Sequence, residues 1–327
     1  MTVNLFASSM GHSLYNQLRR DDVIWHKTAR DFLNEQYNQN KKLLDEGFPK
    51  KFPAEFLRCL WELKLLRYLT SIKQGNLLLS TKDKIKLPDF KWIINEKTYY
   101  FEAISPTKGS TKNYPYLNTQ LSGMPPTRDG TIGHREYRER ITGAFREKAV
   151  CNYNPYVCDM NACNHNHRTG YKTHIEGNGY IIAISMADID FMNQPMNWRV
   201  DLSCFFPISP YMTMDINRAG SIQDIYHSFC PSFNKGNKKE SPINVDIFGS
   251  AEYSHVSAVI ISRHWPVLFP KLSQHEPVLS FDSSDNDFML IHNPYAIHKL
   301  PPKTLPVESE FIAGINGDTW TIQNVKK

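Results

Sequence analysis

Two acidic residues, Asp89 and Glu102, flank a segment that is typical of a β-hairpin. Two β-prone runs, at 89–94 and 98–105, are joined by Asn95-Glu96 at the spacing of a two-residue turn. Asn tolerates the positive φ angle that such a turn needs, although Glu is a poor second turn residue. We therefore expect a hairpin in which Asp89 lies directly across from Glu102.

This pairing sets two like charges side by side on one face of the hairpin, while the aromatic side chains of both runs share the opposite face, which is suited to the core. Like charges at opposed positions destabilise a sheet, so the two carboxylates need a shared proton or a cation. Mg²⁺ is typically held by one or two carboxylates together with water and phosphate oxygens. The alternative is that the turn is displaced by one residue, or that both acids reach water from an exposed face.

The segment resembles the PD-(D/E)XK nuclease superfamily. The resemblance rests on Pro88-Asp89, on Glu102 within Tyr-Tyr-Phe-Glu-Ala, and on a predicted order of helix, three strands, helix and strand over about residues 53–186. It implies a restriction-endonuclease-like core in which Asp89 and Glu102 bind Mg²⁺ or Mn²⁺ from adjacent strands. It also implies an assisting acid on the preceding helix, and Glu62 matches that position.

Glu62 is the only acid in the interior of this helix, which we expect over about residues 56–72 and which is apolar on nearly every side. A buried carboxylate without a partner is costly, so Glu62 needs one. The metal site is one candidate. A salt bridge to Arg58, four residues earlier, is the other.

The lysine of the family motif normally lies two residues after the Glu, where this chain has Ile104. The resemblance therefore requires a lysine from elsewhere in the sequence, and the candidates are Lys91, Lys108 and Lys148. We favour Lys148, because it shares one face of the predicted basic helix 134–150 with Arg140 and Ala144. For each lysine, the alternative is a solvated side chain.

These residues together predict a metal-dependent nuclease that hydrolyses phosphodiester bonds of DNA or RNA. The metal ion polarises the phosphodiester and lowers the pKa of a water molecule, and the lysine orients that water and offsets charge in the transition state. Our candidates for contacts with the nucleic-acid backbone are Arg135, Arg138 and Arg140 on the basic helix. The alternative is a solvated helix with i, i+4 ion pairs.

The segment 151–174 is rich in soft and borderline metal ligands, namely Cys151, Cys158, Cys163, His165, His167 and His174. Four of these could close a tetrahedral zinc site. We expect such a site to be structural, because a closed Cys-rich site leaves no open coordination position for catalysis. The spacings match no common finger class, and an asparagine-rich surface insertion is the alternative.

The order of elements predicts an α/β fold with a mixed central sheet flanked by helices. We expect an N-terminal helical extension at 1–52 and a nuclease-like core at 53–186 that carries the Cys/His-rich insertion. Residues 187–327 are expected to add α/β elements packed on the core, including buried strands at 256–262 and 288–291.

Length and composition are those of a globular protein, with 327 residues, 41% hydrophobic and 22% charged. These values exclude a disordered tail protein, a collagen-like chain and a coiled coil. The longest apolar run is much shorter than the ~20 residues of a membrane-spanning helix, and no signal peptide is visible, so we expect a cytoplasmic protein without a membrane partner. The net charge of +5 is compatible with a nucleic-acid partner.

Two other functions stay open on the sequence alone. The first is a catalytically inactive, nuclease-like binding or scaffold protein, which Ile104 at the lysine position permits. The second is a zinc-stapled nucleic-acid-binding module in which the acidic hairpin is incidental. A homo-oligomer is compatible with each of these functions.

Overall fold

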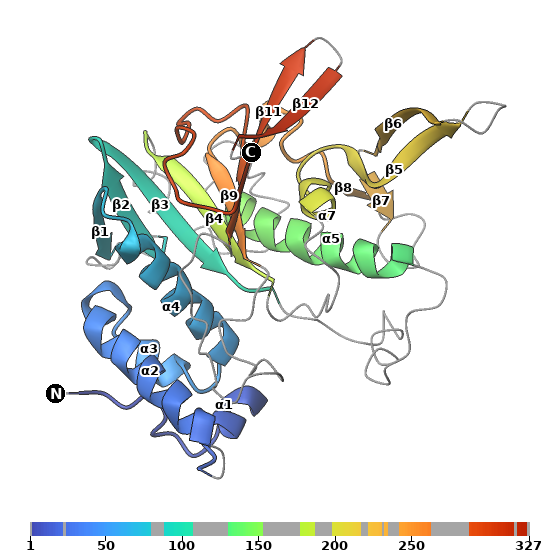
Figure 1. Ribbon diagram of the computed structural model, residues 1–327. Helices are drawn as coiled ribbons and strands as arrows, with labels where there is room; N and C mark the ends of the chain where they lie inside the picture. The colour runs from blue at the N-terminus through green and yellow to red at the C-terminus, as the bar shows by residue number, and fades with distance from the viewer. Residues whose placement is uncertain are drawn as a thin grey trace.

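The centre of the protein is an eight-stranded sheet with the strand order β1-β2-β3-β4-β9-β10-β11-β12 (Figure 1). The computed structural model describes residues 2–21, 24–79, 88–106, 130–152, 177–186, 198–216, 222–230, 232–234, 242–262, 288–316 and 319–325. The strands of the sheet are β1 (Asn76–Leu79), β2 (Phe90–Ile94), β3 (Lys97–Ile104), β4 (Gly179–Ser185), β9 (Ala258–Ser262), β10 (Phe288–His292), β11 (Ser309–Asn316) and β12 (Thr319–Asn324).

The sheet is mixed, which confirms the predicted α/β class. Strands β1, β2 and β3 form an antiparallel meander, and β4 and β9 then continue parallel to β3. Strand β10 is antiparallel to β9, β11 is parallel to β10, and β12 returns antiparallel to β11. Strands β9 to β12 all come from residues 187–327, so the predicted C-terminal elements supply half of the central sheet.

The hairpin between β2 and β3 has the predicted turn. Asn95 and Glu96 have φ angles of 48° and 63°, and positive φ at both central residues is the mark of a type I′ turn. The register pairs Phe90 with Phe101, as expected, and the aromatic side chains on that face are buried in the core. The displaced turn that was the alternative is therefore excluded.

Helix α4 (Phe56–Ser71) covers one face of the sheet and is buried on nearly every side, as its apolar sequence predicts. The indole of Trp61 fixes the helix to the sheet by donating a hydrogen bond to the Ala183 carbonyl of β4 (3.1 Å). The other side of α4 packs against the N-terminal helical extension. That extension comprises α1 (Ser13–Leu18), α2 (Ile24–Asn40), η1 (Lys41–Leu43) and α3 (Phe48–Lys51).

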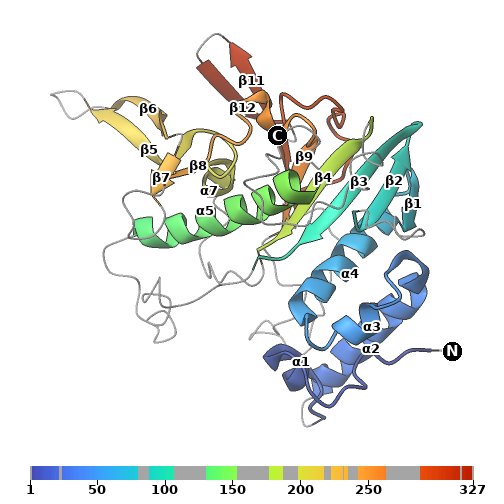
Figure 2. The ribbon, with the colours of Figure 1, turned by 180° about the vertical axis from the view of Figure 1, so that it is seen from behind.

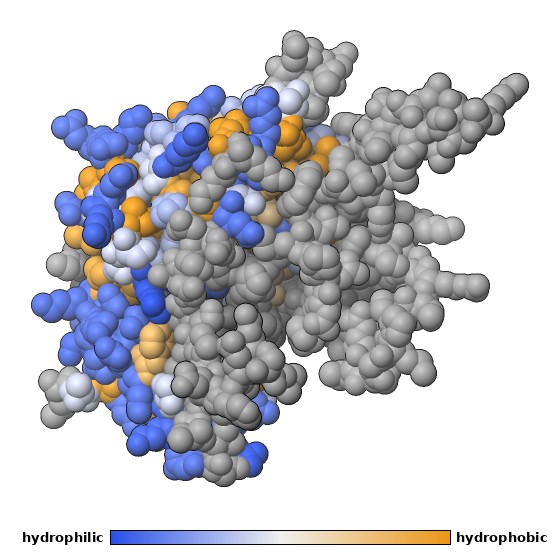
Figure 3. All heavy atoms as spheres, in the orientation of Figure 1, coloured by the Kyte–Doolittle hydropathy of each residue, from blue (hydrophilic) through white to orange (hydrophobic). Residues whose placement is uncertain are grey.

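The outer surface of the extension is polar. In Figure 3, hydrophilic residues gather over these helices, at the lower left of the view. On α2, Asn34 and Asn38 hold the N-terminal segment: the Oδ1 atoms of the two side chains accept hydrogen bonds from the backbone N–H groups of Leu5 and Val3.

The opposite face of the sheet is covered by α5 (Gly130–Arg146), one end of which lies against β4 in Figure 2. This helix continues directly into a π-helical segment, η5 (Glu147–Asn152). The same face also packs against α7 (Trp198–Leu202) and η6 (Ala251–Tyr253). Two small hairpins lie beyond them, made of β5 (Ile208–Ile216) with β6 (Ile222–Phe229) and β7 (Ser232–Asn234) with β8 (Pro242–Asn244).

Across the described ranges, we find no helix with both the length and the apolar character needed to cross a membrane.

Candidate functional site

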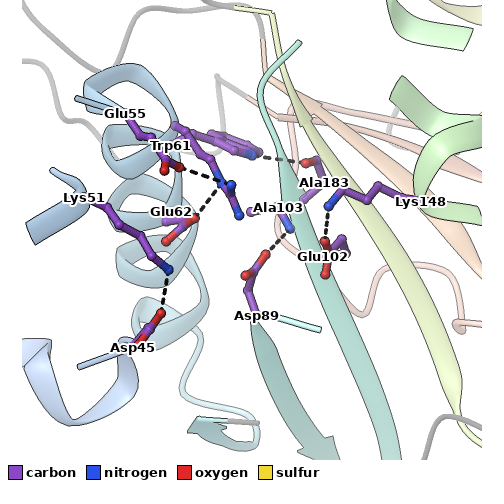
Figure 4. Close-up of polar contacts among 11 residues, drawn as sticks. Asp45, Lys51, Glu55, Trp61, Glu62, Asp89, Glu102, Ala103, Lys148 and Ala183 are labelled. Carbon is purple, nitrogen blue, oxygen red and sulfur yellow. Dashed lines mark hydrogen bonds and ion pairs between the residues drawn. The ribbon is translucent and has the colours of Figure 1, made fainter. Parts of the chain in front are cut away.

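Asp89 lies one residue before strand β2, at the point where β3 extends past its neighbour. Its Oδ2 atom accepts a hydrogen bond from the backbone N–H of Ala103 (2.7 Å), as Figure 4 shows. This bond ties the carboxylate to the carboxyl end of β3. The side chain of Asp89 is therefore fixed at the end of the sheet where the parallel strands β3 and β4 have their carboxyl ends.

Glu102 lies next to this bond on β3, and the register of the hairpin continues to oppose it to Asp89. The residue is 5% exposed, so its carboxylate is almost entirely removed from water. Its Oε1 atom lies 2.6 Å from Nζ of Lys148, which reaches across from η5 (Figure 4). The lysine favoured from the sequence is thus in direct contact with the second acid of the motif.

The three carboxylates of this cluster interact electrostatically. Burial raises the pKa of Asp89 well above its ordinary value, and the negative charges of Glu102 and Glu62 raise it further. Burial also raises the pKa of Glu62, although the charge of Arg58 opposes this effect. Negative charge is therefore concentrated around Asp89, where a cation lowers the electrostatic cost.

Glu62 has the ion-pair partner that was the alternative to the metal. Nε of Arg58 lies 3.2 Å from Oε1 of Glu62, and Nη1 of Arg58 lies 3.2 Å from Oε2 of Glu55. Burial lowers the pKa of Arg58, but the negative charges of Glu62, Asp89 and Glu55 outweigh this effect and raise it. Arg58 therefore belongs to the cluster, and Glu62 contacts it through this guanidinium.

Lys148 owes its position to the π-helical turn. π-Helical segments are rare and are frequently found at functional sites. Burial alone would lower the pKa of Lys148, but the neighbouring charges of Glu102 and Asp89 outweigh it and raise the pKa. Lys148 is thus held as an ammonium group beside the acidic pair.

His255 supports the same turn from the loop before β9. Its Nε2 atom lies 2.9 Å from the carbonyl oxygen of Ala149, the residue after Lys148. Because a carbonyl only accepts hydrogen bonds, Nε2 carries the proton. Burial lowers the pKa of His255 to about 4, so the ring is a neutral donor at physiological pH.

A cavity of about 660 Å³ lies beside the cluster, between α5, the end of β3, the start of α4 and β8. Four of its lining residues are cationic, namely Arg58, Arg140, Arg146 and Lys148. Two are acidic, namely Glu139 and Glu147. Arg140, Ala144 and Lys148, which were predicted to share one helix face, all line the cavity.

The three arginines that were predicted to contact nucleic acid differ in their surroundings. Arg140 lines the cavity. Arg138 is 4% exposed and donates hydrogen bonds from Nε and Nη2 to the Ser203 carbonyl, so it anchors α5 to the turn after α7 and does not present its charge to a ligand. Burial against this turn was not visible in the local sequence, which spaces Arg138 like its exposed neighbours. The side chain of Arg135 lies outside the described residues.

Other candidates also lie where the structure gives no side-chain description. Lys108 and five of the proposed zinc ligands fall outside the described residues, and Cys151 is described only in its backbone. The zinc site therefore stays a prediction. Lys91, which is described, stands opposite Tyr100 in the hairpin register, whereas Lys148 contacts Glu102.

The donor set of the hairpin fits a hard divalent cation. Within the parts of the chain that the structure describes, no three His, Cys, Asp or Glu side chains come together as a metal-binding group. Mg²⁺ needs fewer, because one or two carboxylates suffice when water and phosphate oxygens complete its shell. Asp89 and Glu102 offer two such carboxylates, and burial, followed by the charges of Glu102 and Glu62, raises the pKa of Asp89.

Sequence reasoning missed the roles of Arg146 and His255 and gave Arg58 only the role of a salt-bridge partner. Arg146 and Arg58 line the cavity, and His255 holds η5. The contact of His255 joins residues 106 positions apart, so no local pattern could have found it. The basic spacing of α5 did carry a signal for Arg146.

Comparisons of the chain with protein-family models, with curated proteins and with solved structures gave no match.

Proposed function

We propose that the protein is a metal-dependent nuclease with a PD-(D/E)XK-like active site at the end of the β2–β3 hairpin. The observation that carries the proposal is the contact of Lys148 with Glu102 beside Asp89, at the edge of a cavity lined by four cationic residues. In this proposal Lys148 replaces the lysine that the family motif would have at Ile104.

The arrangement of elements supports the proposal. Helix α4, the antiparallel meander β1–β3, helix α5 and the parallel strand β4 follow one another in the order that the resemblance implies for a restriction-endonuclease-like core. The acidic pair also lies at the carboxyl end of parallel strands, which is a common position for ligand sites in α/β sheets.

Each residue of the cluster has a role in this proposal. Asp89 and Glu102 would hold Mg²⁺ or Mn²⁺. The bound ion supplies Lewis-acid polarisation of the phosphodiester and makes the attacking water more acidic. Lys148 orients that water and offsets the negative charge that develops on the phosphate.

The remaining residues position the substrate and the acids. Arg140 and Arg146 contact phosphate oxygens from the cavity wall, since Arg forms charge-assisted hydrogen bonds with phosphate. Arg58 offsets the charge of Glu62 on α4 through their ion pair. His255 holds the π-helical turn that carries Lys148.

The test is cleavage of single-stranded DNA, double-stranded DNA and RNA in Mg²⁺ or Mn²⁺, with EDTA as the metal-free control. We expect Glu102→Gln to lower the cleavage rate by roughly 10²–10³-fold, a typical loss for one electrostatic group of an active site. The matched control is Glu96→Gln, which removes an exposed carboxylate from the other end of the same hairpin and leaves the rate unchanged. Equal cleavage by the Glu102 variant and the unaltered chain contradicts the proposal.

A second function has one observation in its favour. Glu102 and Glu62 are already paired with Lys148 and Arg58, so the cluster is partly neutralised without any metal. This suits an inactive, nuclease-like protein that binds nucleic acid through the cavity. Tight binding of an oligonucleotide without cleavage in either metal would support this alternative.

A further inference from the structure

The cavity is lined by four cations, whereas the three carboxylates of the cluster do not line it and two of them contact those cations. Arg58, Arg140, Arg146 and Lys148 line the cavity. Asp89, Glu62 and Glu102 are not among the lining residues. An anion in the cavity therefore meets four cationic side chains and the carboxylates of Glu139 and Glu147, and not the three carboxylates of the cluster.

Lys148 belongs to both places. It lines the cavity, and its ammonium group also lies 2.6 Å from Oε1 of Glu102. The pair is largely buried, with 16% of the Lys148 side chain and 7% of the Glu102 side chain exposed. An ion pair so far removed from water is broken only at a cost, unless each partner finds a substitute.

A phosphate group in the cavity and a divalent cation at the acids are two such substitutes. The phosphate offers Lys148 a new acceptor, and Arg140 and Arg146 add charge-assisted hydrogen bonds to it. The cation offers Glu102 a new positive partner. Each ligand thus makes the binding of the other easier, because each takes one partner of the same ion pair.

We propose that the cavity binds a phosphate group of the nucleic-acid backbone, and that this phosphate and the divalent cation bind cooperatively by dividing the Lys148–Glu102 pair between them. The inference rests on the proposed function for the assignment of Asp89 and Glu102 as metal ligands. It adds that the chain without substrate holds metal weakly, because Lys148 occupies the place of the cation at Glu102.

The test measures Mn²⁺ binding by isothermal titration calorimetry in sodium chloride and in sodium sulfate at equal ionic strength and pH. Sulfate serves as the probe because it is a tetrahedral oxyanion, as the phosphate group is. We expect Mn²⁺ to bind about tenfold more tightly in sulfate, within the range of ordinary coupling between two sites. By linkage, Mn²⁺ increases sulfate affinity by the same factor.

Variants separate this coupling from a general salt effect. In Lys148→Met, the affinity for Mn²⁺ becomes the same in chloride and sulfate, because the shared partner is gone. The matched control Lys97→Met removes an exposed lysine of strand β3 and keeps the full sulfate effect. If Lys148→Met does not fold, Arg140→Gln serves instead. We expect this variant to need a higher sulfate concentration for the same increase in Mn²⁺ affinity.

The outcomes distinguish the two proposals. Equal Mn²⁺ affinity in both salts, or a sulfate effect that survives in folded Lys148→Met, overturns the coupling and leaves the nuclease proposal standing. Absence of Mn²⁺ binding in both salts overturns the nuclease proposal itself.

Discussion

Two buried glutamates of the central sheet, Glu102 on β3 and Glu310 on β11, have different surroundings. Glu310 is 1% exposed, and its two carboxylate oxygens both accept hydrogen bonds from the backbone N–H of Lys303 (2.9 and 3.1 Å). Its Oε1 atom also lies 2.8 Å from Nε2 of His292. Glu102, in contrast, contacts the side chain of Lys148, at the wall of a cavity.

The difference separates a carboxylate that is held by the backbone from one that is held by a side chain. Backbone donors cannot leave without unfolding a loop, so Glu310 closes the turn at 301–305 against the sheet. A lysine side chain can exchange its partner for a ligand in the neighbouring cavity. Burial alone, which the two glutamates share, does not separate these roles.

The largest expected effect is the loss of stability when Glu310 is replaced. Glu310→Ala leaves His292 and the Lys303 N–H without their carboxylate, and removal of one partner from a buried pair costs about 3–5 kcal/mol of unfolding free energy. Urea denaturation measures this loss. Mn²⁺ binding by the folded fraction stays unchanged, since Glu310 is not part of the acidic hairpin.

Exposed Glu308 is the control for that variant. We expect Glu308→Ala to change the unfolding free energy by no more than about 0.5 kcal/mol. A Glu310→Ala protein as stable as this control contradicts the structural role.

A buried lysine extends the comparison. Lys64 on α4 is 5% exposed, donates to Oγ of Ser262 (3.0 Å), and has its pKa lowered by burial to about 7. Between pH 7 and about 10 the unfolded chain binds this proton and the folded chain does not, so stability from this group rises with pH by up to ~1.4 kcal/mol per unit. Lys64→Met removes that rise.

Urea denaturation of both proteins at pH 7, 8 and 9 measures the difference. The advantage of Lys64→Met over the unaltered chain should shrink as the pH rises. A difference that does not vary with pH would show that Lys64 keeps its ordinary pKa in the folded protein.

The smallest expected effect concerns Asp89, whose pKa is raised by burial and by neighbouring carboxylates. Above about pH 4 the unfolded chain releases this proton, while the folded chain keeps it to higher pH, so the carboxylate lowers stability as the pH rises. Asp89→Asn therefore stabilises the metal-free protein at pH 7 by about 1–2 kcal/mol, the usual size of such a trade against activity.

The same variant loses Mn²⁺ binding and cleavage, which separates it from Glu310→Ala. Thermal unfolding at pH 7 and pH 4 measures the gain and its decrease in acid. An Asp89→Asn protein that is less stable than the unaltered chain at pH 7 contradicts the electrostatic account of the site.

The hairpin could be predicted from the sequence because its determinants are local. A turn of two residues and the alternation of aromatic side chains fix the register, and the register fixes Asp89 opposite Glu102. Helix α4 was equally local, since apolar residues occupy nearly every side of it. The spacing of an α-helix predicted Lys148 beside Arg140 and Ala144, and all three line the cavity although Lys148 lies in the π-helical segment.

The rest depends on contacts between distant segments. The parallel pairing of β4 with β9 joins residues more than seventy positions apart, so no local pattern indicated that the C-terminal strands enter the central sheet. The burial of Arg138 and the contact of His255 with Ala149 are also long-range. The cavity exists only once α5, β3 and α4 are assembled.

The π-helical turn at Glu147–Asn152 makes the chain sensitive to its length at this point. A π-turn accommodates one more residue than an α-turn, so deleting Glu147 would allow α5 to continue as a regular helix. Each residue of an α-helix advances by about 100°, and the lysine would then point to a different side of the helix. One codon lost at this position would detach the amine from the hairpin and leave every charged side chain of the cluster in the sequence.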